Sequence, residues 1–267
     1  APRAADRSVA KISFTGSNTV GVQVMQRAAE TIKGMSQELG GKSCLLVLVD
    51  ADLDLAVELA CGGGFFNAGQ MCSATSRVLV ADSLADEFLQ RIQARAEGIR
   101  VADPFADDVE MGALINRVQY QRVLGHIQRG VEDGARWLCG GDRPADLPKG
   151  FFIRPTVFTD VPLDSALWNE EIFGPVLCVR RFTSQAEAIA LANDSDFGLV
   201  ASVVSASHET AERVANALQA GLVWINAPQV IFPQAAWGGY KQSSIGRELG
   251  PWGLAAFQEI KHVIRSL

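Results

Sequence analysis

Gln37-Glu38-Leu39-Gly40-Gly41-Lys42-Ser43 and Gly69-Gln70-Met71-Cys72-Ser73-Ala74 are the two stretches from which the rest of the chain is best interpreted. The first places a carboxylate before two glycines, and the second places a cysteine behind a glycine. Covalent thiol chemistry needs a nucleophile that attacks an electrophilic carbon and a base that activates the water that releases the product. Glycines let a substrate or cofactor approach the backbone closely, because they lack a Cβ. Cys72 and Glu38 are therefore the candidate nucleophile and base.

Each of these two residues also has an ordinary interpretation. A cysteine is more often a small buried hydrophobe than a nucleophile, and a glutamate beside two glycines is usually a solvated turn residue. The other cysteines (Cys44, Cys61, Cys139 and Cys178) stand in apolar or glycine-rich surroundings and are interpreted as structural. The catalytic interpretation of Cys72 and Glu38 therefore depends on the remaining motifs.

Composition limits the classes of function. The chain has 267 residues, 48% of them hydrophobic, which is enough for one large or two ordinary domains. A formal net charge of -6 gives no reason to expect nucleic acid or a membrane surface as a partner. The five cysteines are odd in number and lack CxxC spacing, which favours reduced thiols and a cytoplasmic location. The three histidines are isolated, so no metal is expected.

Hydrophobic patterning predicts strands alternating with helices, which is typical of an α/β fold with a mostly parallel sheet. We expect a strand at residues 11–14, a glycine turn and a helix at 19–33, an arrangement in which helix N-terminal amides can meet a pyrophosphate. The helix that begins near Leu53 is expected to end at Gly62-Gly63-Gly64. The remaining predicted strands cover residues 44–49, 77–81, 135–139, 152–158, 176–182, 199–204 and 222–225, and the remaining helices cover 83–100, 116–133, 184–193 and 207–218.

Five segments together resemble the aldehyde dehydrogenase superfamily, in its order and spacing. They are Phe14-Thr15-Gly16-Ser17, Glu38-Leu39-Gly40-Gly41-Lys42, Gly69-Gln70-Met71-Cys72, Glu170-Glu171-Ile172-Phe173-Gly174-Pro175 and Trp237-Gly238-Gly239-Tyr240-Lys241. Further matches, among them Asp103-Pro104-Phe105 and Gly246-Arg247-Glu248-Leu249-Gly250, are similar to the betaine-aldehyde and aminoaldehyde branch.

The resemblance implies a role for each matching residue. Cys72 would form a thiohemiacetal, a hydride would leave to NAD or NADP, and Glu38 would activate the water that hydrolyses the thioester. The implied cofactor-binding residues are Phe14, Thr15, Gly16, Ser17, Val20, Leu39, Gly40, Glu171 and Phe173. The implied substrate-pocket residues are Phe66, Leu222, Ile231 and Trp237, where plain core packing is the alternative. Glu248 resembles a carboxylate behind the site, and a structural salt bridge is its alternative.

The family resemblance also implies an overall organisation. We expect residues 1–40 to be the remaining part of a dinucleotide-binding domain, 41–242 the thiol-bearing catalytic domain, and 243–267 a return segment with an oligomerisation strand. The N-terminal half of the cofactor domain, with its oxyanion Asn and ribose-contacting Lys, has no counterpart in the sequence. The absence of an initiator Met agrees with this expectation, and so we expect residues 1–267 alone to show little activity and to self-associate.

These implications lead to a predicted function and one rival. The predicted function is oxidation of a small aldehyde, of betaine or ω-amino type, to its carboxylic acid by a homo-oligomer (a dimer or a tetramer). The rival is a catalytically inactive fragment that serves as a structural or interaction domain. One departure from the family is Ser244, where glycine is usual. If that position needs a positive φ, serine would cost about 1 kcal/mol or more.

Overall fold

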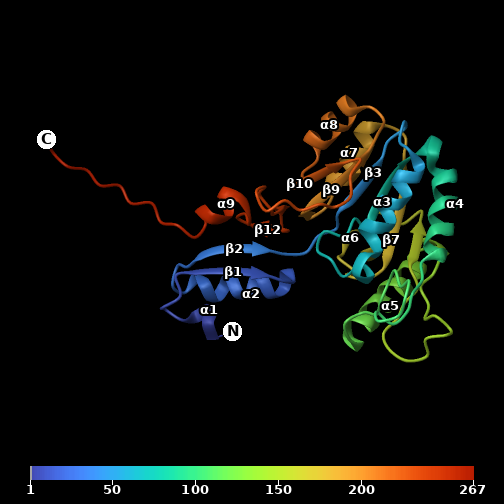
Figure 1. Cartoon of the computed structure of the whole chain (residues 1–267), viewed down its shortest axis with the longest axis horizontal. Helices are drawn as coiled ribbons and strands as arrows, with labels where there is room; N and C mark the ends of the chain where they lie inside the picture. Colours follow the sequence, from blue (N-terminus) through green and yellow to red (C-terminus); the bar gives the residue numbers. More distant parts are fainter. Residues whose placement is uncertain (1) are drawn as a thin grey trace.

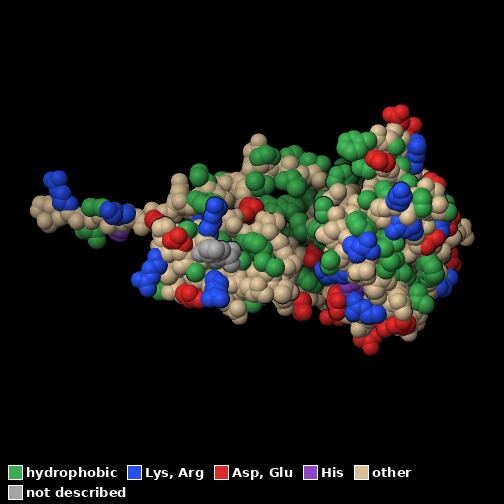
Figure 2. Space-filling view, turned by 90° about the horizontal axis from the view of Figure 1, so that it is seen from below, with side chains coloured by type: hydrophobic (Ala, Val, Ile, Leu, Met, Phe, Trp, Pro, Cys, Tyr) green, Lys and Arg blue, Asp and Glu red, His purple; other side chains and the backbone are tan. Residues whose placement is uncertain are grey.

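The computed structural model describes residues 2–267, which form two lobes and an extended C-terminal tail (Figure 1). The smaller lobe contains α1 (Pro2–Ala5), β1 (Lys11–Thr15), α2 (Asn18–Ala29) and β2 (Gly34–Glu38), together with β12 (Ser244–Ile245) and α9 (Gly250–Ala255) from the end of the chain. Figure 2 shows the same two lobes from below, with acidic and basic side chains interspersed on the larger one. Residues 258–267 form neither helix nor strand and point away from both lobes.

The larger lobe is built on a seven-stranded sheet with the order β10-β9-β3-β4-β7-β6-β5. Neighbouring strands are parallel, except for the antiparallel pair of β5 and β6. The strands are β3 (Cys44–Val47), β4 (Arg77–Ala81), β5 (Arg136–Cys139), β6 (Thr156–Thr159), β7 (Val176–Phe182), β9 (Val200–Val204) and β10 (Leu222–Ile225). A separate pair joins β8 (Phe197–Gly198) to β11 (Tyr240–Lys241). This mostly parallel α/β architecture confirms the predicted fold class.

Helices cover the large sheet and bury its central strands. They are α3 (Leu53–Phe65), the 3-10 turn η1 (Phe66–Gly69), α4 (Asp82–Gly98), α5 (Arg117–Glu132), α6 (Ala166–Asn169), α7 (Gln185–Asn193) and α8 (His208–Ala217). Every residue of β3 and β4 is buried, as expected for parallel strands covered on both faces. Phe88 and Ile92 of α4 are fully buried in the same core. The sheet therefore forms a rigid base for the loops at its edge.

The small sheet joins the two ends of the chain. β1 pairs parallel to β2, and β12 pairs antiparallel to β2 with Ser244 opposite Glu38. The predicted helix over residues 19–33 is wrong at its end, since α2 stops at Ala29 and β2 begins at Gly34. Ser36, Gln37 and Glu38 are buried in β2, so this strand lacks the apolar pattern by which a strand is normally predicted.

Two other element boundaries differ from the prediction. α3 does not end at Gly62 but continues to Phe65. Its glycines serve close packing, since a Cβ on Gly63 would lie 2.1 Å from Thr75 Oγ1 and one on Gly64 would lie 2.3 Å from Leu177 Cδ2. The strand predicted at 152–158 is the shorter β6, which begins just after Pro155, a residue that cannot donate to a strand ladder.

Candidate active site

A cleft of about 580 Å³ opens between the two lobes and contains most of the residues predicted for the site. Both the candidate nucleophile and the candidate base line it. The predicted residues in its lining are Thr15, Gly16, Ser17, Glu38, Leu39, Gly40, Cys72, Glu171, Phe173, Ile231 and Trp237. They come from the β1–α2 turn, the end of β2, the turn after η1, the segment before β7 and the segment before β11. Residues far apart in the sequence therefore meet in one cleft.

The other predicted residues lie outside this lining. Phe14 and Val20 line a neighbouring groove over β1 and α2. Phe66 is 66% exposed and lines a separate pocket beneath α3. Leu222 packs on a small cluster of Leu199, Val200 and Trp224, which Cys72 and Trp237 also contact.

Glu248 lies near Glu38, the candidate base, since its charge affects the pKa of that carboxyl. Its Oε1 accepts a hydrogen bond from Ser13 Oγ at 2.8 Å, and its backbone exchanges two hydrogen bonds with Trp237 at 2.7 and 2.8 Å. The bonds to Trp237 hold the segment that carries this indole against the small lobe.

Backbone strain shapes the turn that carries Cys72. Asn67 and Ala68 have left-handed φ values of 51° and 55°, and Gly69 follows at 69°. A Cβ on Gly69 would lie 2.1 Å from the carbonyl oxygen of Gly174, so only glycine fits there. After Cys72, Ser73 Oγ donates to Gln229 Oε1 at 3.0 Å and Gln229 Nε2 donates to the Ser73 carbonyl at 3.1 Å. The loop that carries Cys72, the candidate nucleophile, is thus held on both sides of the cysteine.

Cys72 differs from the other four cysteines in exposure. Its side chain is half-buried, whereas Cys44, Cys61, Cys139 and Cys178 are buried. Burial, and then the negative charge of Glu171, raises the pKa of the Cys72 thiol. The thiol is therefore approachable but protonated at neutral pH, and its activation requires a positive group to enter the cleft.

Glu38 is buried without a hydrogen-bond partner for either carboxylate oxygen among the described residues. Burial raises the pKa of Glu38 to about 8, the charge of Glu248 adds to this, and Arg247 opposes it. A Cβ on Gly238 would lie 2.9 Å from Glu38 Oε1, so the glycine leaves room for the carboxylate. A carboxylate with such a pKa can take a proton from water near neutral pH.

The link between the lobes is held by hydrogen bonds around Gly40 and Gly41. Gly40 N–H donates to Asn18 Oδ1 at 3.0 Å, and Gly41 N–H donates to Glu171 Oε1 at 3.1 Å. A Cβ on Gly40 would lie 2.5 Å from Glu171 Oε2, and one on Gly41 would lie 2.5 Å from the Cys72 carbonyl oxygen. The two glycines therefore bring the base segment, the Glu171 carboxylate and the thiol loop close together.

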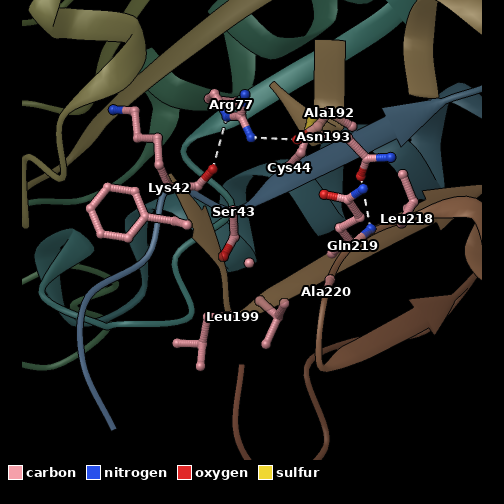
Figure 3. Close-up of a pocket in the computed structure, with 14 residues that line it drawn as sticks. Lys42, Ser43, Cys44, Arg77, Ala192, Asn193, Leu199, Leu218, Gln219 and Ala220 are labelled. Carbon is pink, nitrogen blue, oxygen red and sulfur yellow. Dashed lines mark hydrogen bonds between the residues drawn. The ribbon is translucent and has the colours of Figure 1, made fainter. Parts of the chain in front are cut away.

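Arg77 of β4 holds the segment that follows Gly41 from the side of the large sheet. Its Nε donates to the Lys42 carbonyl at 2.8 Å, and its terminal nitrogens donate to the carbonyls of Leu191 and Ala192 at 3.1 and 2.9 Å. Figure 3 shows the guanidinium between Lys42 and Ala192. The position of the chain just after Gly41 is thus set by the larger lobe.

Two further cleft residues, Gln119 and Arg122, were not predicted. Gln119 Nε2 donates to the carbonyls of Ile172 and Phe173 at 3.0 and 2.7 Å, and Arg122 donates to the Glu171 carbonyl at 2.6 Å. Both lie on α5 and hold the 171–173 segment in place. On an amphipathic helix such polar residues are indistinguishable from a solvated face, so the sequence carried no signal for them.

Ser244 does not occupy a position with a positive φ, so the strain that serine would cause at such a position does not arise. The residue is in β12 with no positive φ; the left-handed positions nearby are Lys241 and Gly246. Ser244 Oγ accepts from the Gly239 N–H at 2.6 Å and donates to the Gly239 carbonyl at 2.8 Å. The serine therefore adds two hydrogen bonds beside Gly238 instead of backbone strain.

Comparison with protein families matches residues 3–263 to the aldehyde dehydrogenase family. The chain belongs to the aldehyde dehydrogenase family. It is 48% identical over 263 residues to the chloroplastic aminoaldehyde dehydrogenase ALDH10A8 of Arabidopsis thaliana, covering 98% of this chain and 52% of that relative. It is 45% identical to the chloroplastic betaine aldehyde dehydrogenase of Beta vulgaris, covering 98% and 53%. This aldehyde dehydrogenase chain thus spans about half the length of the curated relatives that it matches.

Solved structures similar to this chain are also aldehyde dehydrogenases. Betaine aldehyde dehydrogenase of Staphylococcus aureus in complex with NAD+ superposes with a TM-score of 0.93 at 42% identity, over 95% of this chain and 51% of that one. An NAD+ complex of Bacillus cereus aldehyde dehydrogenase gives 0.94 at 42% identity, over 97% and 52%. Within residues 2–267, this aldehyde dehydrogenase chain has no helix long and apolar enough to cross a membrane. Nor do those residues group three His, Cys, Asp or Glu side chains in a way that suits a metal ion.

Proposed function

We propose that this chain carries the thiol and base of an enzyme that oxidises an aldehyde to a carboxylic acid with NAD or NADP. The observation that carries the proposal is the meeting of Cys72 and Glu38 in one cleft, the first from the larger lobe and the second from the end of β2. A nucleophile and a base on facing elements are what a two-step acyl transfer to water requires.

The cleft also suits a nicotinamide dinucleotide. The N-terminus of α2, where Ser17 Oγ caps the Val20 N–H at 3.5 Å, offers free amides of the kind that bind a pyrophosphate. Glu171 presents a half-buried carboxylate beside Gly40, and carboxylates accept hydrogen bonds from vicinal ribose hydroxyls. The relatives solved with NAD+ support this assignment. The cofactor, when bound, supplies the hydride acceptor and a positive charge near the thiol.

The protein's own residues perform the covalent steps. The Cys72 thiol first loses its proton to solvent, and its sulfur then adds to the aldehyde carbon and gives a thiohemiacetal with a negatively charged oxygen. As the carbon–oxygen double bond forms again, a hydride leaves that carbon for the acceptor and a thioester results. Glu38 then takes a proton from water, the resulting hydroxide adds to the thioester carbon, and the carbon–sulfur bond breaks to release the acid and restore the thiolate. Burial keeps Glu38 basic enough for this task.

The substrate class is proposed from the cleft lining and the relatives. Trp237 and Ile231 both line the cleft. An indole face attracts an ammonium by about 0.5–2 kcal/mol, depending on how far the pair is desolvated. The related proteins are named aminoaldehyde and betaine aldehyde dehydrogenases. We therefore propose a small aldehyde that carries an amino or trimethylammonium group.

A homo-oligomer is part of the proposal. Ile260, Val263 and Ile264 of the tail are 98%, 77% and 84% exposed, and β10 is an edge strand of the large sheet. An exposed apolar segment and an unpaired edge strand are complementary features. We propose that residues 260–265 pair with a second copy. Replacing Ile260 and Ile264 by Lys should give a smaller species in light scattering, and an unchanged mass would contradict the pairing.

A cytoplasmic location remains a prediction from the reduced cysteines.

The experiment for the proposed function is a steady-state assay of NADH formation with betaine aldehyde and an aminoaldehyde. Because little activity is expected of residues 1–267 alone, the assay uses a protein in which this chain is joined to the N-terminal half of the cofactor domain of a relative. That protein should form NADH, and its Cys72→Ala variant should form none. Cys178→Ala is the matched control, because Cys178 is fully buried in β7 and should leave turnover unchanged. Equal NADH formation by wild type and Cys72→Ala would contradict the proposal.

A further inference from the structure

A second pocket, separate from the active-site cleft, lies between the start of α5 and the loop before β6. It has a volume of about 340 Å³ and is lined by Arg117, Tyr120, Gln121, Arg143, Pro148, Lys149, Gly150 and Phe151. We call it the α5 pocket. None of these residues lines the active-site cleft.

The charge of the α5 pocket is entirely positive. Arg117, Arg143 and Lys149 line it, and no carboxylate does. None of the three forms an ion pair with any residue in the described range 2–267. Elsewhere in the same lobe, Arg154 pairs with Asp142 at 2.6 Å and Arg136 with Asp160 at 3.1 Å. The α5 pocket thus gathers three cations and no carboxylate in a chain of net charge -6.

Aromatic rings orient two of these cations. The Arg143 guanidinium lies over the Tyr120 ring at 5.2 Å, and the Arg117 guanidinium lies over the Phe151 ring at 5.9 Å. The two rings are 6.0 Å apart and tilted. A guanidinium that stacks through its face keeps its in-plane N–H donors available for a ligand. Arg143 also donates to the Leu147 carbonyl at 3.2 Å, which restrains its side chain.

We propose that the α5 pocket binds the phosphate group of a small molecule. Two arginines and a lysine supply the donors and charge that recognise a phosphate dianion. Tyr120 and Phe151 supply an apolar wall against which the rest of a phosphate ester can pack. The proposal does not depend on the proposed dehydrogenase activity, because the pocket shares no residue with the cleft.

Calorimetric titration with phenyl phosphate and with inorganic phosphate tests the site. Wild type should bind phenyl phosphate with one site per chain, and Arg117→Gln with Lys149→Met should weaken it by about tenfold or more, since charge-assisted hydrogen bonds are lost. Both positions are exposed, so the variant should fold. Arg136→Gln, which removes a paired cation outside the pocket, should bind as wild type does. Tighter binding of phenyl phosphate than of inorganic phosphate identifies an ester as the ligand, and the reverse order identifies free phosphate.

Three results would overturn the proposal. The first is the absence of saturable binding of either compound to wild type. The second is equal affinity in wild type and the double variant. The third is competitive displacement of phenyl phosphate by NAD+, which would place the phosphate in the active-site cleft. The NAD+ competition experiment is needed because Gln119 and Arg122, the neighbours of Tyr120 and Gln121 on α5, line the active-site cleft. Binding of phenyl phosphate by this chain, together with no NADH formation when the chain is joined to the N-terminal half of the cofactor domain, would contradict the dehydrogenase proposal alone.

Discussion

Glu171 Oε1 accepts a hydrogen bond from the Gly41 backbone N–H at 3.1 Å, and this bond fastens the segment after the candidate base to the larger lobe. On the other side of the same link, Gly40 N–H is held by Asn18 of the smaller lobe at 3.0 Å. The relative position of Glu38 and Cys72 therefore depends on two glycines that leave no room for a side chain.

Adding a methyl group at this link should be destabilising. In Gly41→Ala, the new Cβ would lie 2.5 Å from the Cys72 carbonyl oxygen, a backbone atom that cannot move aside easily. We expect a loss of about 1–3 kcal/mol in the free energy of unfolding, measured by denaturant titration. Gly62→Ala is the matched control: nothing lies within 4 Å of its Cβ, and alanine favours a helix by about 0.5–1 kcal/mol. Equal stability of the two variants would refute the packing argument.

Cys72 should be the most reactive thiol of the five. It is half-buried, whereas the other four are buried, and burial raises the pKa of Cys44 and Cys139 to about 11 and of Cys61 to about 12. Iodoacetamide labelling followed by peptide mass spectrometry should modify Cys72 first, with NAD+ changing its rate. Finding Cys72 among the slowest sites would count against its role as a nucleophile.

Glu38 should make the folded protein less stable as the pH rises. Its folded-state pKa of about 8 lies above the unfolded value of 4.5, so between these limits the folded state holds a proton that the unfolded state has lost. The stabilising contribution is complete below pH 4.5 and declines until the pH reaches about 8. Glu38→Gln should therefore be more stable relative to wild type at pH 9 than at pH 5. Melting curves that show the same difference at both pH values would contradict the raised pKa.

The same pKa predicts the pH dependence of catalysis. Only the ionised Glu38 can accept a proton from water, so thioester hydrolysis in wild type should speed up until the pH reaches about 8. Glu38→Gln should hydrolyse the thioester about 10²–10⁴ times more slowly, as is typical for loss of a general base. Single-turnover measurements across the pH range provide the check. A variant with an unchanged rate would exclude Glu38 as the base.

The α/β class was predicted correctly because it depends on local sequence, and the motifs also singled out Glu38 and Cys72, which the structure brings into one cleft. Glu38 and Cys72 were recognised as candidates only in combination with the other family segments, whereas apolar strands such as β3 show clear patterning by themselves. β2 was missed because its buried face is polar, with Gln37 and Glu38 inside. Gln119 and Arg122 were missed because their contacts with the 171–173 segment arise only from tertiary packing. The double hydrogen bond of Ser244 to Gly239 likewise has no counterpart in a sequence pattern.

The central claim is that the aldehyde carbon becomes bonded to Cys72 and is released by water that Glu38 activates. Intact-protein and peptide mass spectrometry of Glu38→Gln, quenched in acid after mixing with NAD+ and betaine aldehyde, tests it most directly. The account predicts an adduct on Cys72 with the mass of the aldehyde less two hydrogen atoms, formed together with one equivalent of NADH. NADH formation without any adduct on Cys72, or an adduct on another cysteine, would contradict it.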